Sequence, residues 1–311
     1  MTLKLRMPRL AFPFTAAPTP ASVEPLRPKL RTGIDYETDW ARSFGARLAR
    51  LALLEGVIGP TMRVLATPER RGLDYLRDLE QPEHTQPVIF AANHHSHVDT
   101  PLLLSSIPEP WRHKMFVGAA ADYFFKTRVT STASALALNA IPIERTRVSR
   151  RSADDAAELI DDGWSMLIFP EGGRSPDGWG QPFRGGAAYL ALRCDVPVVP
   201  VHLEGTGRIM RKGSKRLARS ATRITFGPPL WPDRAAGDDS RRMAARIERA
   251  VAVLADESTT DWYTARLHAH RDATPALSGP EAPSQWRRAW ALGDRGPKHR
   301  RATSRRWPDL T

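Results

Sequence analysis

The feature that most constrains the fold is an alternation of short apolar runs with helical patterns between residues 86 and 229. The apolar runs have the length and composition of buried strands, and the segments between them show helical periodicity. They are the predicted strands Val88–Ala92, Met115–Val117, Trp164–Phe169 and Val196–His202, and the predicted helices Ser152–Asp162 and Gly185–Arg193. Such alternation predicts an α/β sheet with functional loops at the strand ends.

An amphipathic pattern precedes this region, between residues 36 and 66. Apolar residues recur there at spacings of three and four, with charged residues at other positions, which predicts a helix with one apolar face. The apolar positions are Phe44, Leu48, Leu51, Leu54 and Ile58. We expect Gly59 and Pro60 to break this helix, because proline lacks the N–H that an interior helical position requires.

The charge of the chain indicates an anionic partner. Its 46 Lys and Arg residues outnumber 34 Asp and Glu residues, which gives a net charge of +12. Basic residues run from Arg208 to Arg223 without an acidic residue, and the segment Trp286–Trp307 interleaves arginines with tryptophans. This composition suits a membrane surface with anionic lipids, and nucleic acid is the competing partner. No nucleic-acid-binding motif appears in the sequence. The amphipathic segment before the sheet also favours a lipid partner over nucleic acid. Beyond about His270, a solvated and disordered tail explains the composition equally well.

Composition also excludes several classes of protein. Cys194 is the single cysteine, which excludes an internal disulfide and a cysteine-based metal cage. No apolar run reaches the roughly 18 residues of a membrane-spanning helix. The hydrophobic fraction of 41% is high enough for a sizeable core and excludes wholesale disorder.

Polar side chains are concentrated directly after the first predicted strand, in the segment Asn93–Thr100. His94 and Asp99 stand five residues apart at a turn that leads into a helix, so imidazole and carboxylate can meet. In this interpretation His94 is a general base, and Asp99 fixes its tautomer and stabilises its protonated form.

Two other interpretations of the same segment remain open. Ser96 and Asp99 have the spacing of a capping box for the following helix, although a cap does not explain the preceding histidine. His95, His97 and Asp99 also resemble a metal-binding constellation of metallo-β-lactamase-type hydrolases. In those proteins a further histidine normally follows the Asp, where Thr100 stands here.

A glycine-rich turn, Pro170–Ser175, follows another predicted strand. Its glycine pair allows a ligand to approach backbone N–H groups, and Arg174 adds a planar donor fork suited to phosphate. An ordinary charged surface turn is the alternative interpretation. Arg145 follows the apolar segment Ile141–Ile143, and Phe183–Ala188 opens a helix whose N-terminus can accommodate an anion. The prolines within Val196–His202 cannot donate to a sheet, so we expect that strand to end or bulge near a cavity.

Together these segments resemble the glycerolipid acyltransferase family, whose type members acylate lysophosphatidic acid. The resemblance covers about residues 86–229 and rests on four blocks in the family's order. They are matched by Asn93, His94, Ser96 and Asp99; by Ile143-Glu144-Arg145; by Phe169 through Ser175; and by Val196 to Val201. The chain departs from the commoner pattern in having Gly173 in place of threonine and Glu144 in place of aspartate.

The resemblance implies a single central mixed sheet flanked by helices, and acyl transfer without an acyl-enzyme. His94, held by Asp99, would deprotonate the hydroxyl of 1-acyl-glycerol 3-phosphate, and the alkoxide would attack an acyl thioester of CoA or acyl carrier protein to form phosphatidic acid. No metal or other cofactor is implied. The implied substrate-binding residues are Asn93, Ser96, Arg145, Glu171, Gly172, Gly173, Arg174 and Ser175. Glycerol 3-phosphate or another lysophospholipid stays open as the acceptor.

These patterns divide the chain into four segments. We expect a mobile arm over residues 1–33, an amphipathic helical segment that associates with a membrane over 34–80, and an acyltransferase domain over 81–256. Residues 257–311 are expected to be a basic, Trp-containing and largely disordered tail. The expected location is the cytoplasmic face of the cell membrane, as a peripheral or monotopic protein.

Overall fold

The computed structural model describes residues 32–80, 85–109, 111–144, 150–175, 178–210 and 217–279. In this part of the chain, seven strands form one sheet in the order β1-β7-β6-β2-β5-β3-β4. The strands are β1 (Pro68–Arg71), β2 (Ile89–Ala92), β3 (Met115–Ala120), β4 (Ala140–Ile143), β5 (Ser165–Ile168), β6 (Val198–Glu204) and β7 (Thr222–Phe226). All neighbours are parallel except β6 and β7, so the predicted mixed sheet is confirmed.

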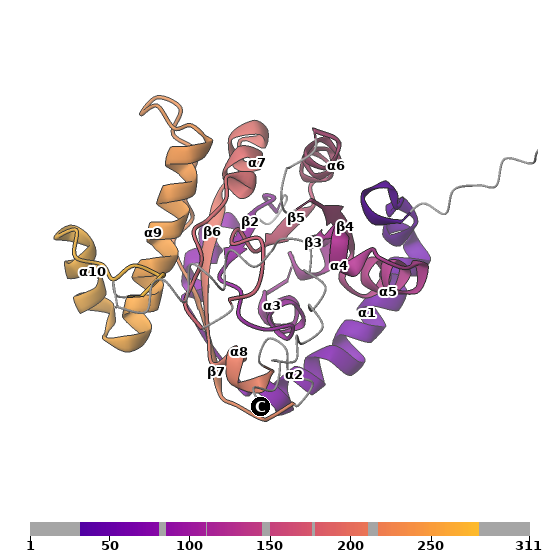
Figure 1. Ribbon diagram of the computed structural model, residues 1–311, viewed down its shortest axis with the longest axis horizontal. Helices are drawn as coiled ribbons and strands as arrows, with labels where there is room; N and C mark the ends of the chain where they lie inside the picture. The colour runs from indigo at the N-terminus through magenta and orange to yellow at the C-terminus, as the bar shows by residue number, and fades with distance from the viewer. Residues whose placement is uncertain are drawn as a thin grey trace, which may run out of the picture. The chain divides into compact units, whose positions relative to one another are not determined.

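Helices cover both faces of this sheet (Figure 1). One face packs against α2 and α3, and the other against α6, α7 and α9. The α-helices are α1 (Phe44–Leu53), α2 (Gly59–Ala66), α3 (Asp99–Ser106), α4 (Ala121–Phe124), α5 (Arg128–Leu138), α6 (Arg150–Asp161), α7 (Gly186–Cys194), α8 (Thr206–Ile209), α9 (Ser240–Thr259) and α10 (Trp262–His270). Shorter turns are η1 (Gly33–Asp35), η2 (Asp39–Arg42), η3 (Leu54–Ile58), η4 (Leu73–Leu79) and η5 (Arg112–Lys114).

The central strand β2 explains why the motifs of the sequence meet. Phe90 packs into the core under α2 and α3, whereas Ile89 and Ala91 pack under α6, α7 and α9. Because both faces of β2 are buried, the strand appears in the sequence as a continuous apolar run. Strand β5 lies beside β2 and parallel to it. The loops that leave their carboxyl ends therefore lie at the same edge of the sheet.

The predicted break at Gly59 and Pro60 is wrong, because the chain stays helical from Phe44 to Ala66. Between α1 and α2, η3 is a π-helical turn, and the N–H of Gly59 donates to the carbonyl of Leu54. Pro60 then lies in the first turn of α2, where its missing N–H costs little. The wider π turn accommodates the proline within a continuous helical segment.

The apolar stripe predicted for this segment is divided between surface and core. Phe44 and Leu48 of α1 are 82% and 56% exposed, whereas Leu54 is 4% exposed and belongs to the core under α2 and α3. Further along, Val57 and Val64 add exposed apolar side chains. The segment thus presents an apolar surface on α1 while its other side anchors it to the sheet.

Two other local predictions are wrong. The helix predicted to start at Ser152 begins at Arg150 instead, and the Ser152 hydroxyl donates to the carbonyl of Pro142 at 3.2 Å. Strand β6 neither ends nor bulges at Pro200, but continues to Glu204 between β2 and β7. The carbonyl of Pro200 still accepts the N–H of Gly227 at 2.8 Å, so this residue loses its donor but keeps its acceptor.

Helical structure continues past the boundary expected at residue 256. Helix α9 extends to Thr259, and α10 follows where the sequence showed no periodicity. The side chain of Asp261 caps α10 by accepting the N–H of Thr264. Residues 1–31 and 280–311, which hold nearly all of the predicted arm and most of the predicted tail, lie outside the described residues. Of the helices in the described ranges, none has the length and apolar character needed to span a membrane.

Candidate active site

Two side chains from the loop after β2 form a hydrogen-bonded pair. Nδ1 of His94 lies 2.8 Å from Oδ2 of Asp99, which is the contact expected from their spacing. The carboxylate is fully buried and the imidazole mostly so. The imidazole also stacks on Phe169, with 4.1 Å between ring centroids and 21° between the planes. These contacts fix the ring and leave Nε2 as the nitrogen available to take a proton from a substrate.

Asp99 is anchored at the start of α3. Its Oδ2 also accepts the backbone N–H of His95 at 2.7 Å and of Ser96 at 2.8 Å. Burial acts to raise the pKa of Asp99, but the hydrogen bond and charge of His94 and the N–H of Ser96 hold this pKa below its ordinary value. Asp99 is therefore a stable anion that can fix one tautomer of His94 and stabilise the imidazolium.

Two residues predicted to bind substrate instead brace this loop from within the protein. Nδ2 of Asn93 donates to the carbonyl of Leu203 at 2.9 Å, and its Oδ1 accepts the Leu203 N–H at 2.7 Å. The Ser96 hydroxyl donates to the carbonyl of Met210 at 2.8 Å. Of the capping box expected from Ser96 and Asp99, the bond from the Ser96 N–H to the Asp99 carboxylate is present, and the Ser96 hydroxyl accepts the N–H of Val98 at 3.4 Å, although the N-cap position of α3 is Val98. Both side chains are buried and position the backbone around His94.

The metal-site interpretation would require His95, His97 and Asp99 to converge. Nε2 of His97 instead lies 3.1 Å from the hydroxyl of Tyr123, and the Asp99 carboxylate is directed to His94 and the loop backbone. Within the described ranges, the potential metal-ligand side chains that do come together are Glu55, Glu109 and His113. The geometry of the loop thus favours the paired His94 and Asp99.

A buried carboxylate ties the glycine-rich turn after β5 to the histidine loop. Oε1 of Glu171 accepts the N–H of His94 at 2.8 Å, and Oε2 accepts the N–H of Gln181 at 2.9 Å. The N–H of Ser175 donates to the carbonyl of His94 at 2.8 Å. The turn therefore holds the main chain of His94 through both its N–H and its carbonyl. Glu171 and Ser175 make these contacts away from the cavity described next.

The carboxyl group of Glu171 has a raised pKa. Burial raises its pKa to about 7, although the N–H groups of His94 and Gln181 act to lower it. The nearby charges of Asp99 and Glu248 also raise this pKa. The contact between the two loops therefore depends on a carboxyl group that titrates near neutral pH.

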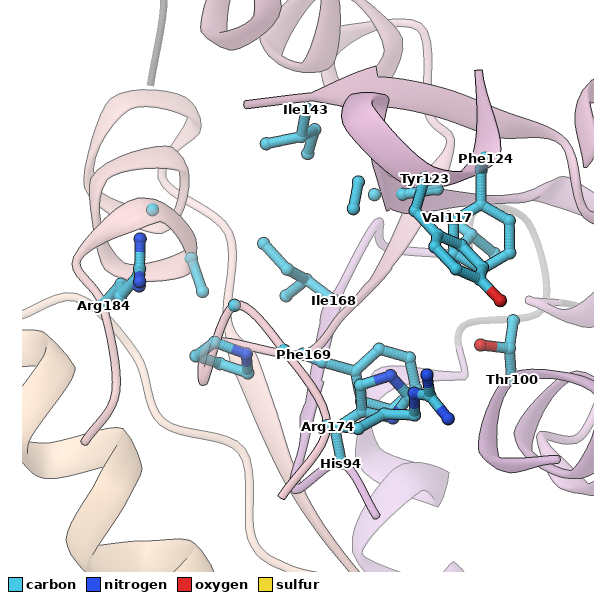
Figure 2. Close-up of a pocket in the computed structure, with 18 of the residues that line it drawn as sticks. His94, Thr100, Val117, Tyr123, Phe124, Ile143, Ile168, Phe169, Arg174 and Arg184 are labelled. Atoms are coloured by element: carbon cyan, nitrogen blue, oxygen red, sulfur yellow. The ribbon is translucent and has the colours of Figure 1, made fainter. Parts of the chain in front are cut away.

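A cavity of about 160 Å³ opens beside the imidazole of His94 (Figure 2). Most of its wall is apolar and comes from the carboxyl ends of β3, β4 and β5. The apolar side chains include Val117, Phe124, Leu138, Ile143, Ile168 and Phe169. Gly172, Gly173 and Arg174 also line it, whereas Arg145 lies outside the described residues. An apolar cavity with a general base and a cation suits an amphiphile that carries an anionic group.

One side of the cavity is closed by aromatic rings. His97 stacks on Tyr123 with 5.4 Å between ring centroids, and both residues line the cavity. Burial, and next the positive charge of Arg174, lower the pKa of His97. His97 is therefore a neutral wall residue at physiological pH rather than a second cation.

Sequence analysis missed Arg184 as a residue of this cavity. Arg184 comes just before α7 and lines the cavity with Gly186 and Ala187 of the first turn of that helix. Figure 2 shows Arg184 and Arg174 on opposite sides of the cavity. The sequence signal was the glycine pair that opens α7, which pointed to a possible anion but not to this arginine.

Comparison with known proteins shows which proteins this chain resembles. Residues 71–204 match the family model described as Acyltransferase, so this segment is similar to the members of that family. Over 164 residues it is 32% identical to the chloroplastic 1-acyl-sn-glycerol-3-phosphate acyltransferase of Brassica napus, a match that covers 50% of this chain and 44% of that protein. It is 25% identical over 185 residues to the human 1-acyl-sn-glycerol-3-phosphate acyltransferase alpha, covering 57% of this chain and 62% of the human protein. The chain thus spans about half the length of these curated relatives.

The architecture also resembles a solved structure. The 1-acyl-sn-glycerophosphate (LPA) acyltransferase PlsC from Thermotoga maritima superposes with a TM-score of 0.55 at 22% identity. The superposition covers 72% of this chain and 86% of the Thermotoga chain. This likeness supports the arrangement of the sheet and its helices.

Proposed function

We propose that the protein transfers a fatty acyl group from a thioester donor to the free hydroxyl of 1-acyl-glycerol 3-phosphate, forming phosphatidic acid. The observation that carries this proposal is the His94 and Asp99 pair at the wall of an apolar cavity. Arg174 on the same wall supplies a cation for the acceptor phosphate. The names of the Brassica and human relatives point to the same acceptor.

The geometry supports direct transfer. Nε2 of His94 takes the proton of the acceptor hydroxyl as its oxygen attacks the thioester carbonyl carbon, and Asp99 stabilises the resulting imidazolium. The new C–O bond forms as the carbonyl electron pair moves to oxygen. The tetrahedral intermediate then breaks its C–S bond, and the leaving thiolate takes the proton back from His94.

A covalent acyl-enzyme is unnecessary in this scheme. Cys194 lies at the end of α7, and burial raises the pKa of its thiol to about 11. A thiol with a raised pKa is a weak nucleophile at neutral pH. We also propose that no metal or cofactor takes part, because His94, Asp99 and Arg174 supply the base and charges that the transfer requires. Activity that persists after dialysis against a chelator would support this point.

The cavity has an apolar part and a cationic part, which suit the acyl chain and the acceptor phosphate respectively. Val117 and Phe124 lie on the aromatic side of the cavity and offer apolar surface to the acyl chain (Figure 2). The acceptor phosphate is only a few bonds from the attacked hydroxyl, so it must bind close to His94. Arg174 meets this requirement, because it lines the cavity beside His94 (Figure 2).

We further propose that the protein works at a membrane surface, peripheral or monotopic on the cytoplasmic face of the cell membrane. The exposed Phe44 and Leu48 of α1 support contact with the apolar layer. The net charge of +12 supports attraction to anionic lipids.

The deciding experiment offers the purified chain labelled acyl-CoA or acyl carrier protein together with a panel of acceptors. Labelled phosphatidic acid from 1-acyl-glycerol 3-phosphate, lost in a His94→Ala variant, is the expected result. Product from glycerol 3-phosphate or another lysophospholipid alone would establish the alternative acceptor. Release of free fatty acid that requires a metal ion would overturn the acyltransferase proposal.

A further inference from the structure

We propose that Arg184 forms a second phosphate subsite, which binds the phosphate of the phosphopantetheine arm of the thioester donor. This inference rests on the proposed acyl transfer and specifies how the donor is held. Arg184 lies outside the four motif blocks, and the reaction scheme above leaves it without a role.

The first observation is that Arg184 is an uncompensated cation. Across the ranges that the structure describes, its guanidinium makes neither a hydrogen bond nor an ion pair, although it lines the cavity. By contrast, Arg193 on α7 pairs with Asp154 at 2.5 Å. The main chain of Arg184 is fixed, because its N–H donates to the carbonyl of Pro170 at 2.9 Å. The residue is thus held in place while its charge remains available.

The second observation is a close fit between Arg184 and the glycine-rich turn. A Cβ atom at Gly172 would lie 2.9 Å from Nε and 3.2 Å from Cζ of Arg184. Gly172 also has a φ of +69°, in the left-handed region that favours glycine. The glycine therefore satisfies the turn and also leaves room for the guanidinium to lie against it.

The third observation is position. Figure 2 shows Arg184 and Arg174 on opposite sides of the cavity with Ile168 between them, and Arg174 is the arginine that lies beside His94. The acceptor phosphate must stay near His94, which assigns it to Arg174. In acyl-CoA and in acyl carrier protein, a phosphate stands at the far end of the pantetheine arm, many bonds from the reacting carbonyl. Arg184, at the remote end of the cavity, fits that phosphate, and the N–H groups of the first turn of α7 reinforce its charge.

The test compares Arg184→Ala and Arg184→Lys with a matched control, Arg193→Ala on the exposed side of α7. Donors are acyl-CoA and acyl carrier protein, which contain the phosphate, and acyl-pantetheine, which lacks it. A charge-assisted contact of this kind predicts that Arg184→Ala raises KM for the phosphorylated donors roughly 10- to 100-fold. KM for the acceptor, and all constants with acyl-pantetheine, should stay close to wild type. Arg184→Lys should recover part of the loss, and Arg193→Ala should behave as wild type.

A second variant tests whether Gly172 acts through Arg184. Gly172→Ala should raise the donor KM, because the new methyl group displaces the guanidinium. The double variant Gly172→Ala with Arg184→Ala should have a donor KM no higher than Arg184→Ala alone, since the contact is already lost. Independent, multiplying effects on the donor KM would overturn the link between these two residues.

The outcomes separate the subsite from the proposed function. A rise in the acceptor KM in place of the donor KM, or an equal loss with acyl-pantetheine, overturns the subsite. An effect with only one of the two phosphorylated donors supports it and identifies the donor. If the wild-type protein transfers no acyl group, the proposed function fails, and calorimetry with 4′-phosphopantetheine and pantetheine still tests the subsite. Equal binding of both compounds by wild type and Arg184→Ala then overturns it.

Discussion

Oδ2 of Asp99 is shared between Nδ1 of His94, at 2.8 Å, and the backbone N–H groups of His95 and Ser96. One carboxylate oxygen therefore orients the imidazole and also shapes the loop that carries it. Loss of the first role should lower the rate of acyl transfer, whereas loss of the second should lower the free energy of unfolding.

His94→Ala should abolish most transfer and leave the fold intact, because the bonds of its main chain to Glu171 and Ser175 do not need the side chain. Loss of a general base is worth about 10² to 10⁴ in rate. Asp99→Asn should be less severe in rate but lower the free energy of unfolding by about 1–3 kcal/mol, since a neutral amide oxygen accepts these three hydrogen bonds more weakly than a carboxylate does. Initial rates and urea unfolding measure the two effects. Near-full activity of His94→Ala would contradict the assignment.

Asn93→Ala should slow turnover without a matching change in KM. The substitution removes both bonds to Leu203 and leaves a buried N–H and carbonyl without partners, which costs about 1–3 kcal/mol of stability. Asn93→Asp should also destabilise, because it sets a negative charge against the Leu203 carbonyl. Steady-state kinetics with denaturant unfolding checks this. A rise in the acceptor KM alone would restore the substrate-binding role first expected for Asn93.

Much of the fold could be predicted from the sequence because its central strands are buried on both faces. Strands β2, β5 and β6 appear as apolar runs for that reason. Edge strand β1 could not be found, since Pro68–Arg71 is polar and largely exposed and pairs only with β7 among the described strands. The π turn at Leu54–Ile58 was hidden because glycine followed by proline ordinarily ends a helix.

In the site, contacts within one loop could be predicted from the sequence, whereas contacts between separate loops could not. The His94 and Asp99 contact lies within one loop, so spacing alone predicted it. The contacts of Glu171 with the His94 N–H, and of Arg184 with Gly172, join residues that only the folded sheet brings together. Residue types could show that Glu171 was a candidate, but not that its carboxylate faces backbone groups.

Glu171 should give stability a specific dependence on pH. Burial raises its pKa from 4.5 to about 7, so between these values the native state holds a proton that the unfolded chain releases. The stabilisation from this group is fully present below pH 4.5 and is lost as the pH rises through about 7. The change is on the order of 3 kcal/mol. Urea unfolding between pH 5 and 8 should show this decline in wild type and not in Glu171→Gln; parallel curves would contradict the raised pKa.

Arg174→Ala should weaken acceptor binding more than donor binding. A charge-assisted contact to phosphate is worth about 1.5–3 kcal/mol, seen as a higher acceptor KM. The same substitution should raise the pKa of His97, because the charge of Arg174 helps to lower it. Kinetics with each substrate varied, and an NMR titration of the His97 ring, give two independent readouts. An effect confined to the donor would exchange the roles assigned to Arg174 and Arg184.

Membrane association should depend on α1. Phe44→Glu with Leu48→Glu should release the protein from liposomes at every ionic strength, because burial of apolar surface contributes roughly 25 cal/mol per Å² and salt does not screen it. Leu54 is unsuitable for this test, since it is part of the core. Tyr263→Glu is the matched control, because Tyr263 is 68% exposed on α10, which lies far from α1 in Figure 1.

Deleting residues 280–311 should matter only at low salt and with anionic lipid. The basic residues of that segment act through electrostatics, which fades over about 10 Å at 0.1 M salt. Flotation of the deletion and of the double glutamate variant, with neutral and anionic vesicles across a salt series, separates the two contributions. We expect the double glutamate variant to remain unbound at the bottom of the gradient under all conditions. The deletion variant should float with the vesicles at high salt, as wild type does. If the double variant floats and the deletion does not, the anchor lies in the C-terminal segment rather than on α1.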